Sequence, residues 1–283
     1  MKIYIDGKYY DEDDAKISVL DHGLLYGDGV FEGIRVYNSR IFRLSEHVDR
    51  LYASAKAIAL TIPVNEKEME AAVAATVRAN NTQDGYIRLI VTRGRGSLGL
   101  DPGSCDRATV IIIVGDIQLY PEEYYRAGIK LVTASTRRVP PECLDARIKS
   151  LNYLNNILAK IEARAAGALE AVMLNTQGFV TECTADNIFI VKDGRLLTPH
   201  PAHGALHGIT MRTVSEIAKK QGIECAESAV TQYDLYAADE CFITGTGAEV
   251  MPVISVDGRI IGDGKPGPVT LQLMEDYRKL AAA

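Results

Sequence analysis

Lys149 is the residue whose surroundings most favour covalent chemistry. It lies in the run ARIKSLNYLNN, residues 146–156, which leads into a stretch that is apolar at helical spacing. A lysine amine attacks a carbonyl only when it is neutral, and a helix N-terminus disfavours the protonated form. We therefore expect Lys149 to lie at the start of a helix over about 151–166 and to suit Schiff-base chemistry. A solvated lysine at a helix start is the alternative that the residues alone leave open.

Three further segments could hold a charged, phosphorylated group. Glu182 precedes a small polar turn and an apolar strand, where its carboxylate could cap the turn or face a cationic ring nitrogen. The run HGIT at 207–210 opens a helix, and the N–H groups of a helix N-terminus bind anions. The run TGTGAE at 244–249 follows a strand and offers N–H groups and hydroxyls to oxyanions. One lysine, one acid and two such turns suit pyridoxal phosphate.

Other patterns of chemistry are weaker. The glycines at 27–33 precede a β-branched, aromatic segment, whereas a dinucleotide-binding turn opens a helix. The three histidines of the run HPAHGALH at 200–207 are separated by a proline and a glycine that would break a metal-binding helix. We therefore expect a solvated loop there and no metal site. No GxSxG motif supports a hydrolase.

Composition places the chain in a broad class. Its 283 residues are 47% hydrophobic and 24% charged, enough for one large domain or two of medium size. The net charge of -6 does not favour nucleic-acid binding. The five cysteines are widely spaced and form no CxxC pair, so we expect reduced thiols. The N-terminus lacks the apolar core of a signal peptide, and no apolar run approaches a membrane helix, so we expect a cytoplasmic protein.

Turn signals and apolar periodicity predict the elements that must position these residues. Ser45 and Asn65 are predicted to cap two helices, the second ending near residue 80. Turn pairs at 6–7 and 38–39 predict two hairpins, and a glycine-rich loop is predicted at 93–103. The strands predicted in the first half are 2–5, 8–10, 32–37, 40–42, 86–92 and 109–114.

A change of pattern predicts a second domain. Residues 116–121 are the expected linker between an N-terminal domain, 1–115, and a C-terminal domain, 122–283. Strands and helices mix without an internal repeat, which predicts an α+β protein with two domains. The strands predicted in the second half are 130–133, 171–175, 187–191, 241–244 and 253–256, and the helices are about 151–166, 210–221 and 268–281.

Seven segments, taken in order, resemble the class IV, or fold-type IV, pyridoxal-phosphate aminotransferases, and most of all the branched-chain amino acid aminotransferases. The resemblance runs from Lys2 to about Lys279 without a large insertion. It implies a smaller N-terminal α/β domain and a larger, strand-rich pseudo-barrel domain that binds pyridoxal 5'-phosphate. The segments are DHGLLYGDGVFEGIR from Asp21, EHVDRLYASAK from Glu46, GYIRLIVTRG from Gly85, IKSLNYLN from Ile148, TECTADNIFIVKDG from Thr181, HGIT from His207 and FITGTGAEVMPV from Phe242.

The resemblance also implies a role for each matching residue. Lys149 is similar to the catalytic lysine, which carries the cofactor and shuttles a proton, and Glu182 to the partner of the pyridine nitrogen. Tyr153 resembles the tyrosine that bonds the cofactor's phenolic oxygen. Arg50, Ile209, Thr210 and Thr246 resemble the phosphate clamp. The substrate residues implied are Thr246 and Gly247 for the α-carboxylate, and Tyr26, Phe31, Tyr86 and Arg88 for the rest of the pocket.

The implied activity is transamination between a branched-chain L-amino acid and 2-oxoglutarate through a lysine Schiff base. D-amino acid aminotransferases, aminodeoxychorismate lyases and amine transaminases share the fold and remain alternatives. Met211 stands where the family usually has Arg or Lys, and Gly247 where it often has Ala. The expected partners are amino acids, 2-oxo acids and further copies of the chain in a homo-oligomer, with no nucleic acid and no membrane.

Overall fold

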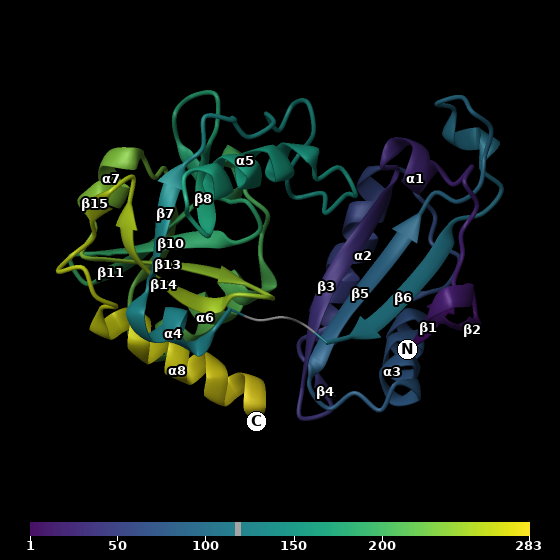
Figure 1. Cartoon of the computed structure of the whole chain (residues 1–283), viewed down its shortest axis with the longest axis horizontal. Coiled ribbons are helices and arrows are strands. Elements are labelled where there is room, and N and C mark those ends of the chain that lie inside the picture. Colours follow the sequence, from purple (N-terminus) through teal and green to yellow (C-terminus); the bar gives the residue numbers. More distant parts are fainter. Residues whose placement is uncertain (117–119) are drawn as a thin grey trace. The chain divides into compact units, whose positions relative to one another are not determined.

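The computed structural model describes residues 1–116 and 120–283 and divides into two compact units (Figure 1). The first comprises the described residues up to 116 together with Ile148–Asn152. The second comprises the described residues from 120 to Arg147 together with Tyr153–Ala283. Within the predicted linker at 116–121, residues 117–119 lie outside the described residues. The segment around Lys149 therefore belongs to the first unit although it follows more than twenty residues of the second.

The described residues of the first unit form a six-stranded antiparallel sheet in the order β2-β1-β6-β5-β3-β4 (Figure 1). Both predicted hairpins are confirmed, and their turn residues have positive φ, as such two-residue turns require. The strands are β1 (Lys2–Ile5), β2 (Lys8–Asp11), β3 (Gly29–Tyr37), β4 (Arg40–Ile41), β5 (Gly85–Thr92) and β6 (Thr109–Gly115).

Two helices cover one face of this sheet. Apolar side chains of β3, β5 and β6 alternate toward helices α2 (Leu44–Ala57) and α3 (Glu66–Ala79) and form the core of the unit. Asn65 caps α3 with a capping box to Glu68, as predicted. The predicted cap at Ser45 is wrong: the N-cap is Arg43, two residues earlier, which has a left-handed conformation, and α2 begins at Leu44. The shorter elements are η1 (Glu12–Asp14), α1 (His22–Tyr26) and η2 (Pro102–Ser104).

The described residues of the second unit form a nine-stranded mixed sheet in the order β12-β11-β10-β13-β14-β7-β8-β9, with β15 beside β14. Strand β9 also lies against β10 and β11, so the sheet curls toward closure. Its buried residues form a large apolar core. The strands are β7 (Ile129–Thr133), β8 (Glu170–Leu174), β9 (Val180–Cys183), β10 (Asn187–Lys192), β11 (Arg195–Pro199), β12 (Cys225–Ser228), β13 (Glu240–Gly245), β14 (Glu249–Val256) and β15 (Arg259–Ile260).

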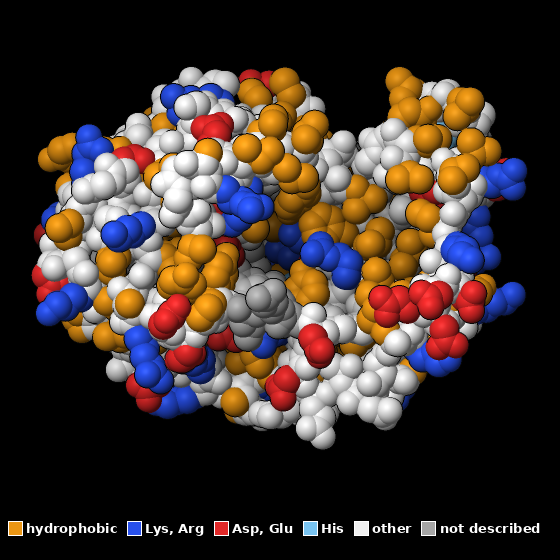
Figure 2. All heavy atoms as spheres, in the orientation of Figure 1, with side chains coloured by type: hydrophobic (Ala, Val, Ile, Leu, Met, Phe, Trp, Pro, Cys, Tyr) orange, Lys and Arg blue, Asp and Glu red, His pale blue; other side chains and the backbone are white. Residues whose placement is uncertain are grey.

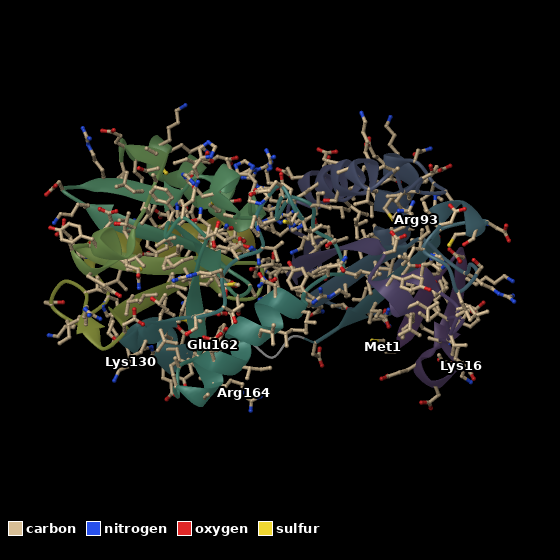
Figure 3. The ribbon with its side chains drawn as sticks, turned by 90° about the horizontal axis from the view of Figure 1, so that it is seen from above. Met1, Lys16, Arg93, Lys130, Glu162 and Arg164 are labelled. Carbon is tan, nitrogen blue, oxygen red and sulfur yellow. The ribbon has the colours of Figure 1, made fainter. Side chains whose placement is uncertain are left out.

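Helices flank this curled sheet. The Glu162 carboxylate, labelled in Figure 3, accepts hydrogen bonds from Ser135 and Thr136 and thereby fixes the long helix α5 beside the end of β7. No helix in the described part of the chain combines the length and apolarity needed to cross a bilayer. The helices are α4 (Glu122–Ala127), α5 (Leu154–Ala165), η3 (Pro201–His203), α6 (Ile209–Lys220), α7 (Gln232–Tyr236) and α8 (Pro268–Ala282).

One expectation about Lys149 is wrong. The helix predicted over 151–166 begins at Leu154, so Lys149 lies five residues before it. Residues 148–151 instead pair with the edge of β3, through a bridge between Val30 and Ser150 and a bond from the Leu151 N–H to the Gly29 carbonyl. Strand pairing has overridden the helical periodicity, and the helix dipole cannot explain the chemistry of this lysine.

Candidate active site

The main chain of Lys149 is fixed within the first unit. Its carbonyl accepts a hydrogen bond from the Phe31 N–H at 3.0 Å, and its own N–H donates to the Ser54 hydroxyl on α2 at 3.1 Å. Its ammonium lies 4.6 Å from the centroid of the Phe31 ring, whose face attracts a cation. The side chain therefore projects from a rigid strand edge onto an aromatic surface.

Three predicted pocket residues meet on the face of this sheet that α2 and α3 leave uncovered. The Arg88 guanidinium carbon lies 4.6 Å from the centroid of Phe31 and 5.4 Å from that of Tyr86. Tyr86 lies across Gly33, where an added Cβ would overlap the tyrosine hydroxyl. The result is a cationic and aromatic surface that can contact both apolar and anionic groups.

Arg50, predicted to bind phosphate, projects from α2 and is held by Glu32 of β3. Its Nε and Nη2 donate to the two carboxylate oxygens of Glu32, each at 2.7 Å. The His47 Nδ1 lies 2.7 Å from Glu32 Oε2. Burial acts to raise the pKa of the Glu32 carboxyl, but Arg50 and His47 together lower it to about 2. Burial lowers the pKa of His47 and outweighs the opposing effect of Glu32. Neutral His47 thus lies behind a Glu32–Arg50 ion pair.

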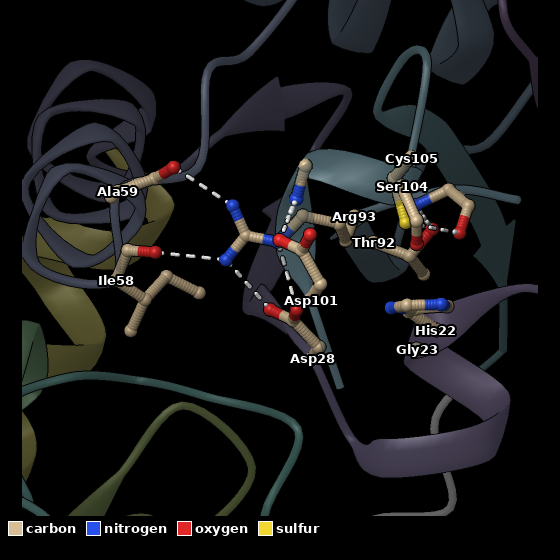
Figure 4. Close-up of polar contacts among 12 residues, drawn as sticks. His22, Gly23, Asp28, Ile58, Ala59, Thr92, Arg93, Asp101, Ser104 and Cys105 are labelled. Carbon is tan, nitrogen blue, oxygen red and sulfur yellow. Dashed lines mark hydrogen bonds and ion pairs between the residues drawn. The ribbon is translucent and has the colours of Figure 1, made fainter. Parts of the chain in front are cut away.

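Tyr26 has a different environment on α1. Its hydroxyl donates to the Leu98 carbonyl at 2.6 Å, in the loop that follows β5. Figure 4 shows how Arg93 anchors the start of that loop: its guanidinium binds Asp28 and the carbonyls of Ile58 and Ala59. The placement of Tyr26 in the substrate pocket stays a prediction.

Glu182, predicted to face the ring nitrogen, lies buried on β9 of the second unit. Its Oε1 lies 2.7 Å from Arg138 Nη2, and its Oε2 accepts the Leu206 N–H at 2.8 Å. Arg138 also donates from Nε to the Gly204 carbonyl at 3.0 Å. Glu182 is thereby tied to the segment that leads into α6, and its carboxylate is stabilised as an anion.

The predicted phosphate-binding segments of the second unit lie at the start of a helix and in a turn between two strands. Ile209 and Thr210 are the first two residues of α6, and an added Cβ on the preceding Gly208 would overlap the Asn187 amide. Thr246 and Gly247 form the turn between β13 and β14 and are half-buried. Free N–H groups at a helix N-terminus and in such a turn favour bound anions.

These residues fit pyridoxal phosphate as a donor set. Within the second unit, the buried Glu182 carboxylate is suited to a protonated ring nitrogen. It accepts the Leu206 N–H, and Leu206 lies in the segment that leads into the N-terminus of α6. Tyr153, at the N-cap of α5, offers a phenol. Within the first unit, Lys149 offers an amine and Arg50 a guanidinium. An amine, an anion partner for a ring N–H and two phosphate-type donors match the functional groups of that cofactor.

Sequence reasoning missed Glu32, His47 and Arg138. Among the described residues, no group of three or more His, Cys, Asp or Glu side chains is arranged to hold a metal ion. The His200 and His207 rings both lie 3.5 Å from Glu227, in a partly exposed surface cluster. All five cysteines are free thiols, of which Cys183 and Cys241 are buried.

Comparison with known proteins identifies the family. A family model described as "Amino-transferase class IV" matches residues 29–256. The chain belongs to the class IV aminotransferases. A putative branched-chain-amino-acid aminotransferase of Methanocaldococcus jannaschii is 51% identical over 280 residues, covering 99% of this chain and 96% of the relative. A D-alanine aminotransferase of Listeria monocytogenes is 39% identical, covering 98% and 95%.

Solved structures of class IV relatives confirm the predicted architecture. The T.th. branched-chain amino acid aminotransferase with pyridoxamine 5'-phosphate is 41% identical, has a TM-score of 0.95, and covers 99% of this chain and 94% of that chain. The same enzyme complexed with N-(5'-phosphopyridoxyl)-L-glutamate is 40% identical, with a TM-score of 0.94 and the same coverage. The predicted family, fold class and aminotransferase activity are confirmed.

Proposed function

We propose that this class IV aminotransferase carries pyridoxal 5'-phosphate on Lys149 as a Schiff base and moves amino groups between branched-chain L-amino acids and 2-oxoglutarate. The observation that carries the proposal is the fixed placement of Lys149, with its main chain bonded to Phe31 and Ser54 and its amine over an aromatic ring. The proposed branched-chain substrates are supported by similar proteins, in sequence and in structure, whose names include branched-chain amino acid aminotransferase.

In this proposal, Glu182 binds the ring nitrogen and Tyr153 the phenolic oxygen. Arg138 keeps Glu182 anionic, so that the ring nitrogen keeps its proton. The proposed phosphate clamp consists of Arg50, Ile209, Thr210 and Thr246.

The proposed chemistry requires one mobile proton. Pyridoxal phosphate supplies an electron sink for the pair of electrons left when the substrate loses its α-proton. With the cofactor bound, Lys149 Nζ would act as the general base that accepts the substrate's α-proton and would later give a proton back. The amine lies 4.6 Å from the centroid of the Phe31 ring, so that this aromatic face forms one wall beside it.

The proposed substrate contacts separate the carboxylates from the side chain. The turn of Thr246 and Gly247 would hold the α-carboxylate through N–H groups. Phe31 and Tyr86, with Tyr26, would provide an apolar wall, and Arg88 the partner for the second carboxylate of glutamate. One pocket then serves leucine and glutamate in turn.

The test is the half-reaction of the holoenzyme with L- and D-amino acids, followed through the cofactor absorbance. L-Leucine, L-valine, L-isoleucine and L-glutamate should each convert the cofactor to its amine form. Borohydride reduction and peptide mapping should find the pyridoxyl group on Lys149. A label on another lysine would refute the role of Lys149, and inert branched-chain substrates would refute the specificity.

A second candidate is transamination of D-amino acids, favoured by the D-alanine aminotransferase relative at 39% identity. The same amino-acid panel separates the two. Turnover of D-alanine without turnover of L-leucine would support the D-specific function.

We also propose that the chain forms a homo-oligomer. In the second unit, α5 exposes an apolar stripe, and hydrophobic side chains gather over it in Figure 2. Exposed apolar patches of this kind mark association surfaces. Light scattering at micromolar concentration should exceed the monomer mass of 30.8 kDa. The exposed residues of the stripe are Leu154, Ile157, Leu158 and Ile161.

The domain boundaries 1–115 and 122–283, with a linker at 116–121, likewise stay a proposal. Limited proteolysis should cut first within 116–121 if this segment links two folded domains. Initial cleavage elsewhere would argue for a different boundary.

A further inference from the structure

Glu32 is an unusual residue at its position in the first unit. It lies on β3 between the apolar residues Val30 and Ile34, all three are fully buried, and they share one face of the strand. Removing a carboxylate from water costs free energy, and a buried ion pair is often no more stabilising than apolar residues of the same size. The stability of the core therefore does not account for a carboxylate here.

The contacts of Glu32 are directed at a single functional side chain. Both of its oxygens accept from Arg50, one from Nε and one from Nη2, each at 2.7 Å. This two-point contact fixes the plane of the guanidinium and occupies one edge of it. The direction in which Arg50 presents its opposite edge is then set by Glu32.

His47 is the second residue of α2 that contacts the Glu32 carboxylate. It is 2% exposed, and its Nδ1 lies 2.7 Å from Glu32 Oε2. Because burial keeps the pKa of His47 low, the ring acts as a neutral hydrogen-bond donor and the negative charge of Glu32 remains matched to Arg50. The carboxylate is thus held on one side by a neutral donor and on the other by the guanidinium.

Helix α2 links this arrangement to the lysine. His47, Arg50 and Ser54 are three and four residues apart and lie on one face of the helix. The Ser54 hydroxyl accepts the Lys149 N–H. One rigid helix therefore positions both the guanidinium and the main chain of the lysine.

We propose that Glu32, supported by His47, is a positioning residue that orients Arg50 to bind the cofactor's phosphate group. The proposal rests on the proposed function, in which Arg50 belongs to the phosphate clamp. Orienting a long, flexible side chain before binding reduces the entropy lost when the ligand arrives. Loss of Glu32 should weaken recognition of the phosphate and leave recognition of the ring unchanged.

The experiment compares two ligands that differ only in the phosphate. Apoenzyme is titrated with pyridoxal 5'-phosphate and with pyridoxal. The dissociation constant of pyridoxal divided by that of pyridoxal 5'-phosphate measures phosphate recognition. Glu32→Gln should lower this ratio on the order of tenfold or more, as expected for a misdirected charge-assisted contact. In an Arg50→Ala background, Glu32→Gln should have little further effect, because the side chain that it orients is gone.

A matched control is Glu240→Gln in the second unit. Glu240 is also buried and accepts hydrogen bonds from the N–H groups of Val269 and Thr270, so it reports the general cost of neutralising a buried carboxylate. Its ratio should equal that of the wild type. If Glu32→Gln does not fold, the ratio of Glu32→Asp decides, because the shorter side chain keeps the charge and displaces Arg50.

The outcomes separate this proposal from the proposed function. Wild-type apoenzyme that does not discriminate between the two ligands would refute the proposed phosphate clamp itself. Wild-type discrimination that persists unchanged in Glu32→Gln, or in Glu32→Asp if only that variant folds, would refute the positioning role alone. Equal losses in Glu32→Gln and Glu240→Gln would also overturn it.

Discussion

Each unit holds a charged side chain of the proposed cofactor site against a buried partner of opposite charge, but the two units do so with different elements. In the first, Glu32 of β3 meets Arg50 of α2, so that both members of the pair lie on regular secondary structure. In the second, Glu182 lies on β9, and its partner Arg138 lies in the irregular segment between β7 and α5. A strand and a helix fix the first pair, whereas the second depends on the folding of loops.

The two ion pairs also differ in the additional hydrogen bonds that hold them in place. Arg138 bonds Glu182 and also the Gly204 carbonyl, so that one side chain joins two irregular segments to a strand. In the first unit, the additional contact to Glu32 comes from His47, which lies on the same helix as Arg50. Loops open more readily than packed helices and strands. Damage to the pair in the second unit should therefore spread through its loops, whereas damage in the first should stay local.

The largest effect is expected from Lys149→Ala, which disturbs neither pair. Transamination should fall by at least about 10³-fold, because the variant lacks the amine that we propose as general base and covalent anchor. The fold should persist, since the bonds to Phe31 and Ser54 use the main chain of residue 149. Steady-state kinetics and the circular dichroism spectrum measure the two quantities. Retained activity would show that another group moves the proton.

Arg138→Met should break the pair in the second unit and destabilise the protein. Removing one partner leaves an uncompensated buried charge, which costs roughly 3–5 kcal/mol. Urea unfolding of the apoprotein measures this loss. Hydrogen exchange should rise in the segment around Gly204, to which Arg138 donates. The double variant Arg138→Met, Glu182→Met should recover much of the stability, and a double variant as unstable as the single one would contradict this account.

Glu182→Gln should retain the cofactor and slow proton abstraction. In the proposed site, an amide does not hold a proton on the ring nitrogen as a carboxylate does, so the transition state loses electrostatic stabilisation. The rate of proton abstraction should fall by on the order of 10²-fold. Single-turnover kinetics with L-leucine measure the effect, and the cofactor absorbance reports occupancy. An unchanged rate would assign Glu182 a structural role, as the anchor of Arg138.

The same two pairs explain what sequence could and could not predict. Local signals were sufficient for the hairpins, the Asn65 cap and most strands, because turn residues and alternation act over a few residues. Glu32 carried an available signal: strand alternation places it with Val30 and Ile34, and an inward carboxylate needs a partner. Arg138 carried none, because Arg137 beside it has the same chemistry and only the tertiary fold distinguishes them.

The position of Lys149 shows a further limit. Apolar periodicity predicted a helix from 151, yet residues 148–151 pair with β3, more than one hundred residues earlier in the chain. Long-range strand pairing cannot be inferred from the local pattern. The family resemblance indicated the lysine, but its placement at a strand edge required the structure.

The smallest and most selective effect is expected from Arg88→Ala. The Arg88 guanidinium lies against the rings of Phe31 and Tyr86, at 4.6 and 5.4 Å from their centroids. A guanidinium stacked in this way keeps donors at its edge, so it can pair with a carboxylate while its faces stay on apolar groups. In the proposed pocket it would bind the side-chain carboxylate of glutamate, which is otherwise costly to desolvate.

Arg88→Ala should therefore weaken the half-reaction with glutamate by roughly 1.5–3 kcal/mol, the contribution of a charge-assisted hydrogen bond. The half-reaction with leucine should change much less, because leucine has no second carboxylate. Stopped-flow rates for both amino acids on one variant give the selectivity directly. Arg40→Ala, an exposed arginine on β4 of the same sheet, is the control and should change neither rate. Equal losses for glutamate and leucine would mean that Arg88 supports the aromatic surface without reading the second carboxylate.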